Sequence, residues 1–173
     1  MNYFELYDLP VSFHPDQNVV KRQFYALSKK YHPDFYINED TEKQDEVLEL
    51  STLNNKAFQV LKNPQKVLHY VLELKGMITE GESYALPQSF LMEMMEVNET
   101  IMDLQFDPDV DKAAQVKAEI ASIEQSLNDK LLSHTSGFQA LSVDEQEQKL
   151  VKIKDIYYRN KYILRLKESL AKL

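Results

Sequence analysis

Apolar positions along the chain repeat at the 3.6-residue spacing of amphipathic helices, and no segment alternates like a strand between hairpin turns. This pattern predicts an all-α protein. The periodicity and the helix-breaking residues predict seven helices, at about residues 3–9, 17–31, 41–62, 64–75, 87–104, 109–133 and 143–172. Gly76 and Gly81 fall in the polar stretch KGMITEGESYALP, which divides these helices into two groups.

The breaker-rich stretch also predicts the domain organisation. We expect residues 1–75 to form one helical domain, residues 76–86 a linker, and residues 87–173 a second domain. The short connections FDPDVDK and SHTSGFQALS join the last three helices. Short connections make consecutive helices antiparallel neighbours, so the second domain is predicted to be a three-helix bundle.

Four of the helices have an apolar stripe that is predicted to face a core. In the first domain the stripes are Val20, Phe24, Leu27 and Tyr31, then Val47, Leu50, Asn54, Ala57 and Leu61. In the second they are Phe90, Met94, Val97, Ile101 and Leu104, then Leu150, Ile153, Ile156, Tyr157, Ile163, Leu164 and Leu170. The polar Asn54 either hydrogen-bonds across the core or lies at its edge.

The helix predicted at 87–104 has more apolar surface than one core requires. Its second stripe consists of Leu91, Met92 and Met95, and more loosely Met102. Tyr158 and Tyr162 lie out of phase with the core side of the last helix and could extend this stripe. Two interpretations stay open. The stripe is an exposed binding patch, to which flexible methionines are suited, or it packs against the third helix or the first domain.

The tripeptide His-Pro-Asp occurs twice, at residues 14–16 and 32–34. Asp16 directly precedes an amphipathic helix, so its carboxylate is expected to accept hydrogen bonds from the first-turn amides. Pro33 disfavours helical geometry at His32 and therefore ends the same helix. The first copy is thus predicted to open a helix, and the second to lie in an exposed loop suited to recognition.

The helix between the two copies has a basic outer face on an acidic protein. This face carries Lys21, Arg22, Tyr25 and Lys29, with Lys30 nearby. The formal net charge of the chain is −8, which argues against nucleic acid or an anionic membrane as the main partner. The basic face is therefore interpreted either as a docking strip for an acidic protein or as an ordinary solvated surface.

Several other classes of protein are disfavoured. The absence of cysteine excludes disulfides and thiol catalysis and fits a reducing, cytoplasmic compartment. No apolar run approaches the roughly 20 residues of a membrane span, and the N-terminus has no secretory signal pattern. A hydrolase built on His32 and Asp34 is disfavoured because no nucleophile motif accompanies them.

We also expect no metal and no cofactor. The histidines are scattered without zinc-site spacing, at positions 14, 32, 69 and 134. DPDVDK begins like a calcium loop, but Lys112 and Ala118 stand where such a loop needs glycine and glutamate. This segment is therefore predicted to be a helix cap.

The order of features in residues 1–75 resembles a J-domain: a short helix, a basic helix ending KKYHPD, a loop, and a long helix ending LNNKAFQVLKNP. In that family the tripeptide and the basic helix engage a DnaK-type chaperone and stimulate its ATP hydrolysis. The resemblance implies that the stimulating element is His32, Pro33 and Asp34, and that the docking surface is Lys21, Arg22, Tyr25, Lys29 and Lys30. Phe35 stands where many members of the family have a basic residue.

The whole chain, with its opening MNYFELYDLP and its later FLMEMMEVNE, is similar to the HscB family of iron–sulfur co-chaperones, in the bacterial form without a zinc motif. Members bind the scaffold protein IscU and present it to the DnaK-type chaperone HscA. The resemblance implies that the scaffold contacts are Leu91, Met92, Met95 and either Tyr158 or the adjacent Tyr157. Any cluster would then belong to the scaffold. The alternative is a J-domain co-chaperone for a different client.

Overall fold

The structure is a computed structural model that describes all 173 residues, and it contains helices and no strands. Its elements are α1 (Tyr3–Leu6), α2 (Gln17–Lys30), η1 (Pro33–Tyr36), α3 (Thr41–Leu61), α4 (Pro64–Leu74), α5 (Gln88–Phe106), α6 (Val110–Thr135), η2 (Phe138–Ala140) and α7 (Val143–Ala171). The predicted all-α fold is confirmed. The chain forms two compact units, Met1–Lys75 and Gly76–Leu173.

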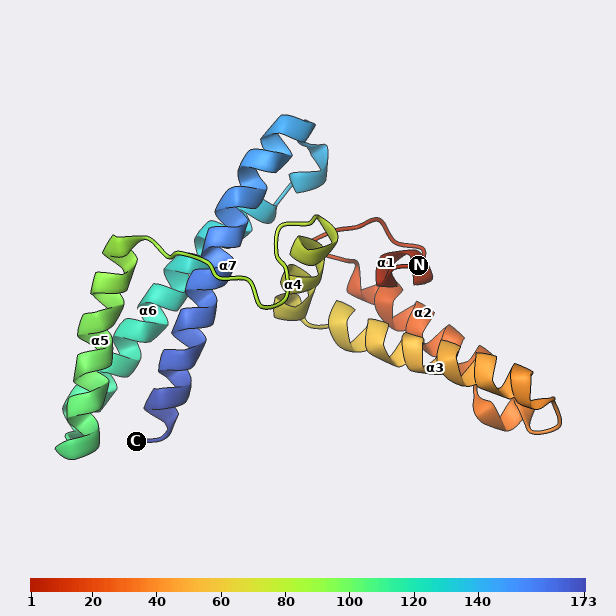
Figure 1. Cartoon of the computed structure of the whole chain (residues 1–173), viewed down its shortest axis with the longest axis horizontal. Coiled ribbons are helices and arrows are strands. Elements are labelled where there is room, and N and C mark those ends of the chain that lie inside the picture. The colour runs from red at the N-terminus through yellow and green to blue at the C-terminus, as the bar shows by residue number, and fades with distance from the viewer. The chain divides into compact units, whose positions relative to one another are not determined.

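The N-terminal unit is built around a hairpin of α2 and α3, which lie side by side with η1 at their far end (Figure 1). The rings of Phe24 on α2 and Phe58 on α3 stack with their centroids 4.0 Å apart. The backbone amide of Tyr3 donates to the hydroxyl of Tyr70 at 3.0 Å, and this bond ties α1 to α4. The short flanking helices thus close the hairpin into a single core.

A buried hydrogen-bond network centred on Asn54 joins three parts of this core. The Tyr7 hydroxyl donates to Asn54 Oδ1 at 2.8 Å. The Asn54 amide donates to the carbonyl of Phe24 and to the Ser28 hydroxyl, both at 3.1 Å. Asn54 is 1% exposed, so the interpretation that it bonds across the core is confirmed. Because each of its polar atoms has a partner, its burial carries little desolvation penalty.

The helix ends follow local chemistry. Asp16 accepts from the amides of Asn18 and Val19, so the predicted cap of α2 is confirmed. One expectation was wrong. The first helix ends at Leu6 rather than near residue 9, because Asp8 takes a left-handed φ of 56° that a helix cannot accommodate. The loop after His32 contains a 3₁₀ turn, η1, with Pro33 at its first position.

The C-terminal unit is a bundle of α5, α6 and α7, with α5 alongside one half of the longer α6–α7 pair (Figure 1). The predicted stripe of α5 is buried in full: Phe90, Met94, Val97, Ile101 and Leu104. Val116, Ile120 and Leu127 of α6 and Ile156 and Ile163 of α7 complete the core. The carboxylate of Asp109 accepts from the amides of Asp111 and Lys112, as expected of a helix cap.

The core side of α7 was predicted with two errors. Tyr162, predicted to lie out of phase with the core side, packs against the bundle core, and its ring meets that of Phe90 edge-on with the centroids 6.0 Å apart. Leu164 is 49% exposed, whereas Leu166, which the prediction left out, is buried. Leu166 lies three residues beyond the buried Ile163 and so shares its face of the helix, while Leu164 is turned by about 100°. None of the helices combines the length and the hydropathy needed to cross a membrane.

Candidate partner-binding sites

The second His-Pro-Asp copy lies on the surface at the end of α2. His32 has extended backbone angles and caps η1: the amide of Asp34 donates to His32 Nδ1 at 3.3 Å. Nδ1 also lies 3.6 Å from the Asp34 carboxylate. An Nδ1 that accepts a hydrogen bond leaves the proton of the neutral ring on Nε2. All three side chains of the tripeptide are exposed, so the imidazole N–H and the carboxylate are available to a partner.

Two further residues hold the loop that follows the tripeptide. The hydroxyl of Tyr36 donates to the carbonyl of Lys30 at 2.8 Å, and this bond folds η1 back onto the end of α2. The side-chain amide of Gln44 on α3 approaches the carbonyls of Tyr36, Ile37 and Glu39 at 3.0–3.2 Å. The tripeptide is therefore presented on a turn tied to both helices. Gln44 was not singled out from the sequence.

The predicted docking face of α2 is solvent-exposed along its length. Its residues Lys21, Arg22, Tyr25, Lys29 and Lys30 are all classed as exposed. No ion pair within the chain occupies Lys21, Arg22 or Lys29. Lys30 lies over the ring of Tyr31, with its Nζ 5.2 Å from the ring centroid. A row of unpaired cations next to the tripeptide suits an acidic protein surface.

The second stripe of α5 points away from the bundle core. Leu91 is 36% exposed, Met92 62% and Met95 57%, while the neighbouring Phe90 and Met94 are buried. We call Leu91, Met92 and Met95 the α5 patch. Its exposure favours the binding-patch interpretation over packing within the C-terminal unit. Isolated apolar residues on a surface are ordinary, but three on one turn of a helix form a contiguous contact area.

The segment between the last helix of the N-terminal unit and α5, residues 76–86, lies against α7 (Figure 1). The hydroxyl of Tyr84 donates to Asp155 Oδ1 at 2.8 Å, and the hydroxyl of Tyr158 donates to Glu82. The rings of Tyr84 and Tyr158 stack with centroids 4.4 Å apart and planes 8° from parallel. Lys154 Nζ lies 3.3 Å from the Glu82 carboxylate. This stretch, expected to be a linker, is thus bonded to the bundle.

These contacts change the acidity of the groups involved. Burial, followed by the hydrogen bond to Asp155, raises the pKa of Tyr84 to about 12. Burial and the bond to Glu82 also raise the pKa of Tyr158 above its usual value. The hydrogen bond from Tyr158 lowers the pKa of Glu82, and Lys154 acts in the same direction. At neutral pH both tyrosines therefore donate, and Glu82 accepts as a carboxylate.

Glu82 and Tyr84 were missed by the sequence interpretation. In an extended segment, residues two apart point to the same side, so the spacing of ESY in residues 82–84 was the available signal. Tyr157 and Tyr158, between which the sequence could not choose, are both half-buried. Tyr158 is the one that stacks on Tyr84, and Tyr157 meets the Tyr158 ring at a steep angle of 78°.

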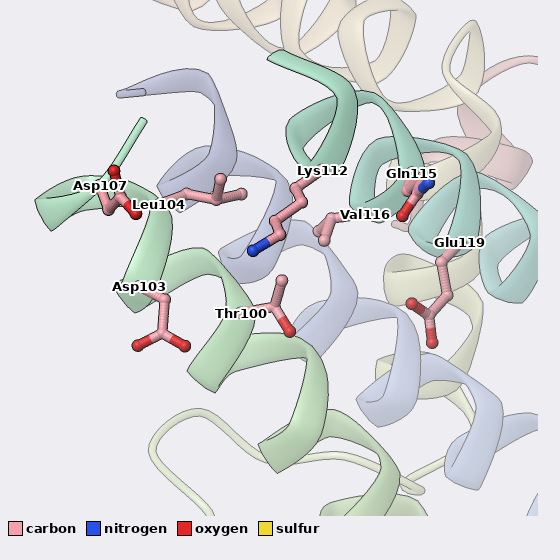
Figure 2. A pocket seen from close by; sticks show the side chains of 8 residues that line it. All are labelled: Thr100, Asp103, Leu104, Asp107, Lys112, Gln115, Val116 and Glu119. Atoms are coloured by element: carbon pink, nitrogen blue, oxygen red, sulfur yellow. The ribbon is translucent and has the colours of Figure 1, made fainter. Parts of the chain in front are cut away.

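A surface hollow of about 400 Å³ lies between the end of α5 and the start of α6 (Figure 2). Leu104 and Val116 form its apolar part, and Asp103, Lys112 and Glu119 are among the polar residues around it. The polar side chains except that of the half-buried Thr100 are exposed, and no group of three or more metal-ligating side chains is present in the chain. The hollow contains none of the residues predicted to bind a partner, and it defines no ligand.

Comparison with known proteins places the chain in a family. A family model described as the HSCB C-terminal oligomerisation domain matches residues 86–171. The Co-chaperone protein HscB homolog of Vibrio parahaemolyticus is 34% identical over 141 residues, covering 76% of this chain and 82% of the relative. The protein of the same name from Colwellia psychrerythraea is 30% identical over 172 residues, covering 98% of each.

Two solved structures share the fold. Chaperone HscB from Vibrio cholerae superposes with a TM-score of 0.71 at 24% identity, covering 99% of this chain and 96% of that chain. The human co-chaperone protein HscB superposes with a TM-score of 0.76 at 24% identity, covering 99% and 81%. A helical hairpin ending in an exposed His-Pro-Asp turn, followed by a three-helix bundle, defines a J-domain protein with a C-terminal helical domain. The chain belongs to the HscB co-chaperone family.

Proposed function

We propose that the protein is a bridging co-chaperone of iron–sulfur cluster assembly in the cytoplasm. Its C-terminal bundle binds the scaffold protein IscU. Its J-domain delivers the scaffold to a DnaK-type chaperone of the HscA kind and stimulates that chaperone's ATP hydrolysis. The protein performs no covalent chemistry itself, and any iron–sulfur cluster is carried by the scaffold.

One observation carries this proposal more than any other. The α5 patch lies in solvent on a helix whose opposite face already fills a complete core. A helix that needed only to build the bundle would have no use for a second apolar stripe. The family to which the chain belongs consists of proteins named as co-chaperones, and this supports a protein partner for the patch.

The chaperone side of the proposal rests on the N-terminal unit. His32, Pro33 and Asp34 are exposed on a turn braced by Tyr36 and Gln44. The exposed cations of α2 lie on the helix that leads into this turn. We propose that the tripeptide is the stimulating element. In this account the α2 face, Lys21, Arg22, Tyr25, Lys29 and Lys30, orients the chaperone and raises the association rate.

The client is tested by binding of purified IscU-type scaffold to the full-length protein, measured by calorimetry. Saturable one-to-one binding that is weakened by alanine substitution in the α5 patch is the expected result. Failure of the scaffold to bind, with chaperone stimulation intact, would leave a J-domain co-chaperone for a different client. Failure of both would remove the bridging function altogether.

A further inference from the structure

The segment of residues 76–86 holds Tyr158, one of the two tyrosines that the family resemblance implies as a scaffold contact. Tyr158 is held at two points: its ring stacks on Tyr84, and its hydroxyl donates to Glu82. Lys161 lies 5.7 Å from the centroid of the Tyr158 ring, which adds a cation–π contact. With both ring and hydroxyl held by other groups, Tyr158 has one orientation.

The same segment is linked to the start of α5 through a second set of contacts. Asp155, which accepts from Tyr84, is also bonded by Arg159 Nε at 2.6 Å. The guanidinium of Arg159 lies 5.1 Å from the ring centroid of Phe90. Phe90 is the residue immediately before the α5 patch and is buried in the bundle core. The segment, α7 and the beginning of α5 therefore share one network of polar and aromatic contacts.

We propose that Glu82 and Tyr84 are positioning residues for scaffold binding, which hold the Tyr158 ring in the orientation that meets the partner together with the α5 patch. This inference rests on the proposed function. A side chain that is already fixed loses less conformational freedom on binding, and each side chain that must be immobilised costs about 0.5–1.5 kcal/mol of affinity. Glu82 and Tyr84 contribute to affinity in this way without forming the main contact area.

The experiment measures scaffold affinity for the full-length protein and for Glu82→Ala, with Glu80→Ala as the matched control. Glu80 is an exposed carboxylate in the same segment, with no ion pair or side-chain hydrogen bond. Glu82→Ala is expected to weaken binding by about 3- to 10-fold. Glu82→Gln, which keeps an acceptor for the Tyr158 hydroxyl, is expected to bind within about 2-fold of the unsubstituted protein. Glu80→Ala should bind normally.

A double-mutant cycle separates positioning from a general structural role. If Glu82 acts through the Tyr158 hydroxyl, Tyr158→Phe should weaken binding by a similar factor, and combining it with Glu82→Ala should cost nothing further. Glu82→Ala combined with Leu91→Ala should be additive. The inference is overturned if the effects of Glu82→Ala and Leu91→Ala on affinity are non-additive while those of Glu82→Ala and Tyr158→Phe are additive. The segment would then support the bundle as a whole.

Two other results would also overturn it: unchanged affinity in Glu82→Ala, or tighter binding, which would mean that the segment covers Tyr158. Failure of the proposed function is recognised separately. If Leu91→Ala and Met95→Ala bind the scaffold as well as the unsubstituted protein does, the α5 patch is not the scaffold site. If those two variants bind weakly while Glu82→Ala binds normally, the proposed function stands and the positioning role is rejected.

Discussion

Replacing Leu91, Met92 and Met95 together by alanine should abolish most of the scaffold affinity while leaving the bundle folded. Complete burial of a leucine or methionine side chain is worth about 1.5–3 kcal/mol. The structure leaves 36% of Leu91, 62% of Met92 and 57% of Met95 exposed, so a partner can still bury about half of each side chain, or about 1 kcal/mol apiece. The sum of about 3 kcal/mol corresponds to a dissociation constant about 100-fold higher.

The stability of the triple variant is the second half of this prediction. Because the three side chains point outward, their truncation should reduce the free energy of unfolding by only about 1–2 kcal/mol in total. Met94→Ala is the contrasting variant: Met94 is fully buried, and its truncation should cost about 2–5 kcal/mol. Leu132→Ala, at an exposed apolar position on α6, is the matched control and should change neither property.

Calorimetric titration of the scaffold and urea denaturation measure the two halves. The reasoning is refuted if the triple variant loses as much stability as Met94→Ala, because the three residues would then belong to the core. It is also refuted if the triple variant binds the scaffold with unchanged affinity.

Four further predictions follow from the structure. His32→Gln should abolish stimulation of the chaperone's ATP turnover with an unchanged circular dichroism spectrum, whereas His14→Gln should retain the stimulation. If both variants lose stimulation equally, position does not distinguish the two tripeptides. Raising the salt concentration from 0.1 to 1 M shortens the Debye length from about 10 to about 3 Å, so chaperone docking to the α2 face should weaken markedly. Docking that does not depend on salt would show that the α2 face does not bind the chaperone. Asn54→Ala should lower the unfolding free energy of the N-terminal unit by about 2–4 kcal/mol in urea, because several buried groups lose their partners; a neutral result would contradict the network. The pKa of Tyr84 is raised to about 12, so the stability that its neutral form provides is complete below pH about 10 and is lost as the pH rises toward 12. Measured by denaturant unfolding, Tyr84→Phe should therefore lose less stability than the unsubstituted protein over that pH interval. An identical loss in the two proteins would contradict the raised pKa.

Much of the fold could be predicted because helical periodicity is a local property. Spacings of three and four place Phe90, Met94 and Val97 on one face whatever surrounds the helix, and the structure buries all three. Local chemistry was equally informative at Asp16. An aspartate directly before an amphipathic helix is a preferred N-cap, and its carboxylate caps α2 in the structure. The sequence could only pose the question of whether the α5 patch is exposed. The packing of α6 and α7 leaves its three side chains outside the core of the bundle.

The parts that failed depend on tertiary contacts. The segment of residues 76–86 has no helical period. The spacing of Glu82 and Tyr84 places them on one side of an extended segment, but it does not show that they bond to α7. Leu164 was wrongly assigned to the core side of α7, since a long helix with apolar residues on several faces does not indicate which face meets its neighbours. The roles proposed for the tripeptide and the α5 patch came from resemblance to a family, because exposure alone does not name a partner.

The central claim, that one molecule couples a scaffold to a chaperone ATPase, is tested most directly by steady-state ATP hydrolysis. The rate of the HscA-type chaperone is measured with the protein alone, with IscU alone and with both together. The account predicts that both together stimulate more than the sum of the two separately. The α5-patch variant should keep only the stimulation given by the protein alone, and His32→Gln should lose all of it. Stimulation that is merely additive, or that survives His32→Gln, would contradict the account.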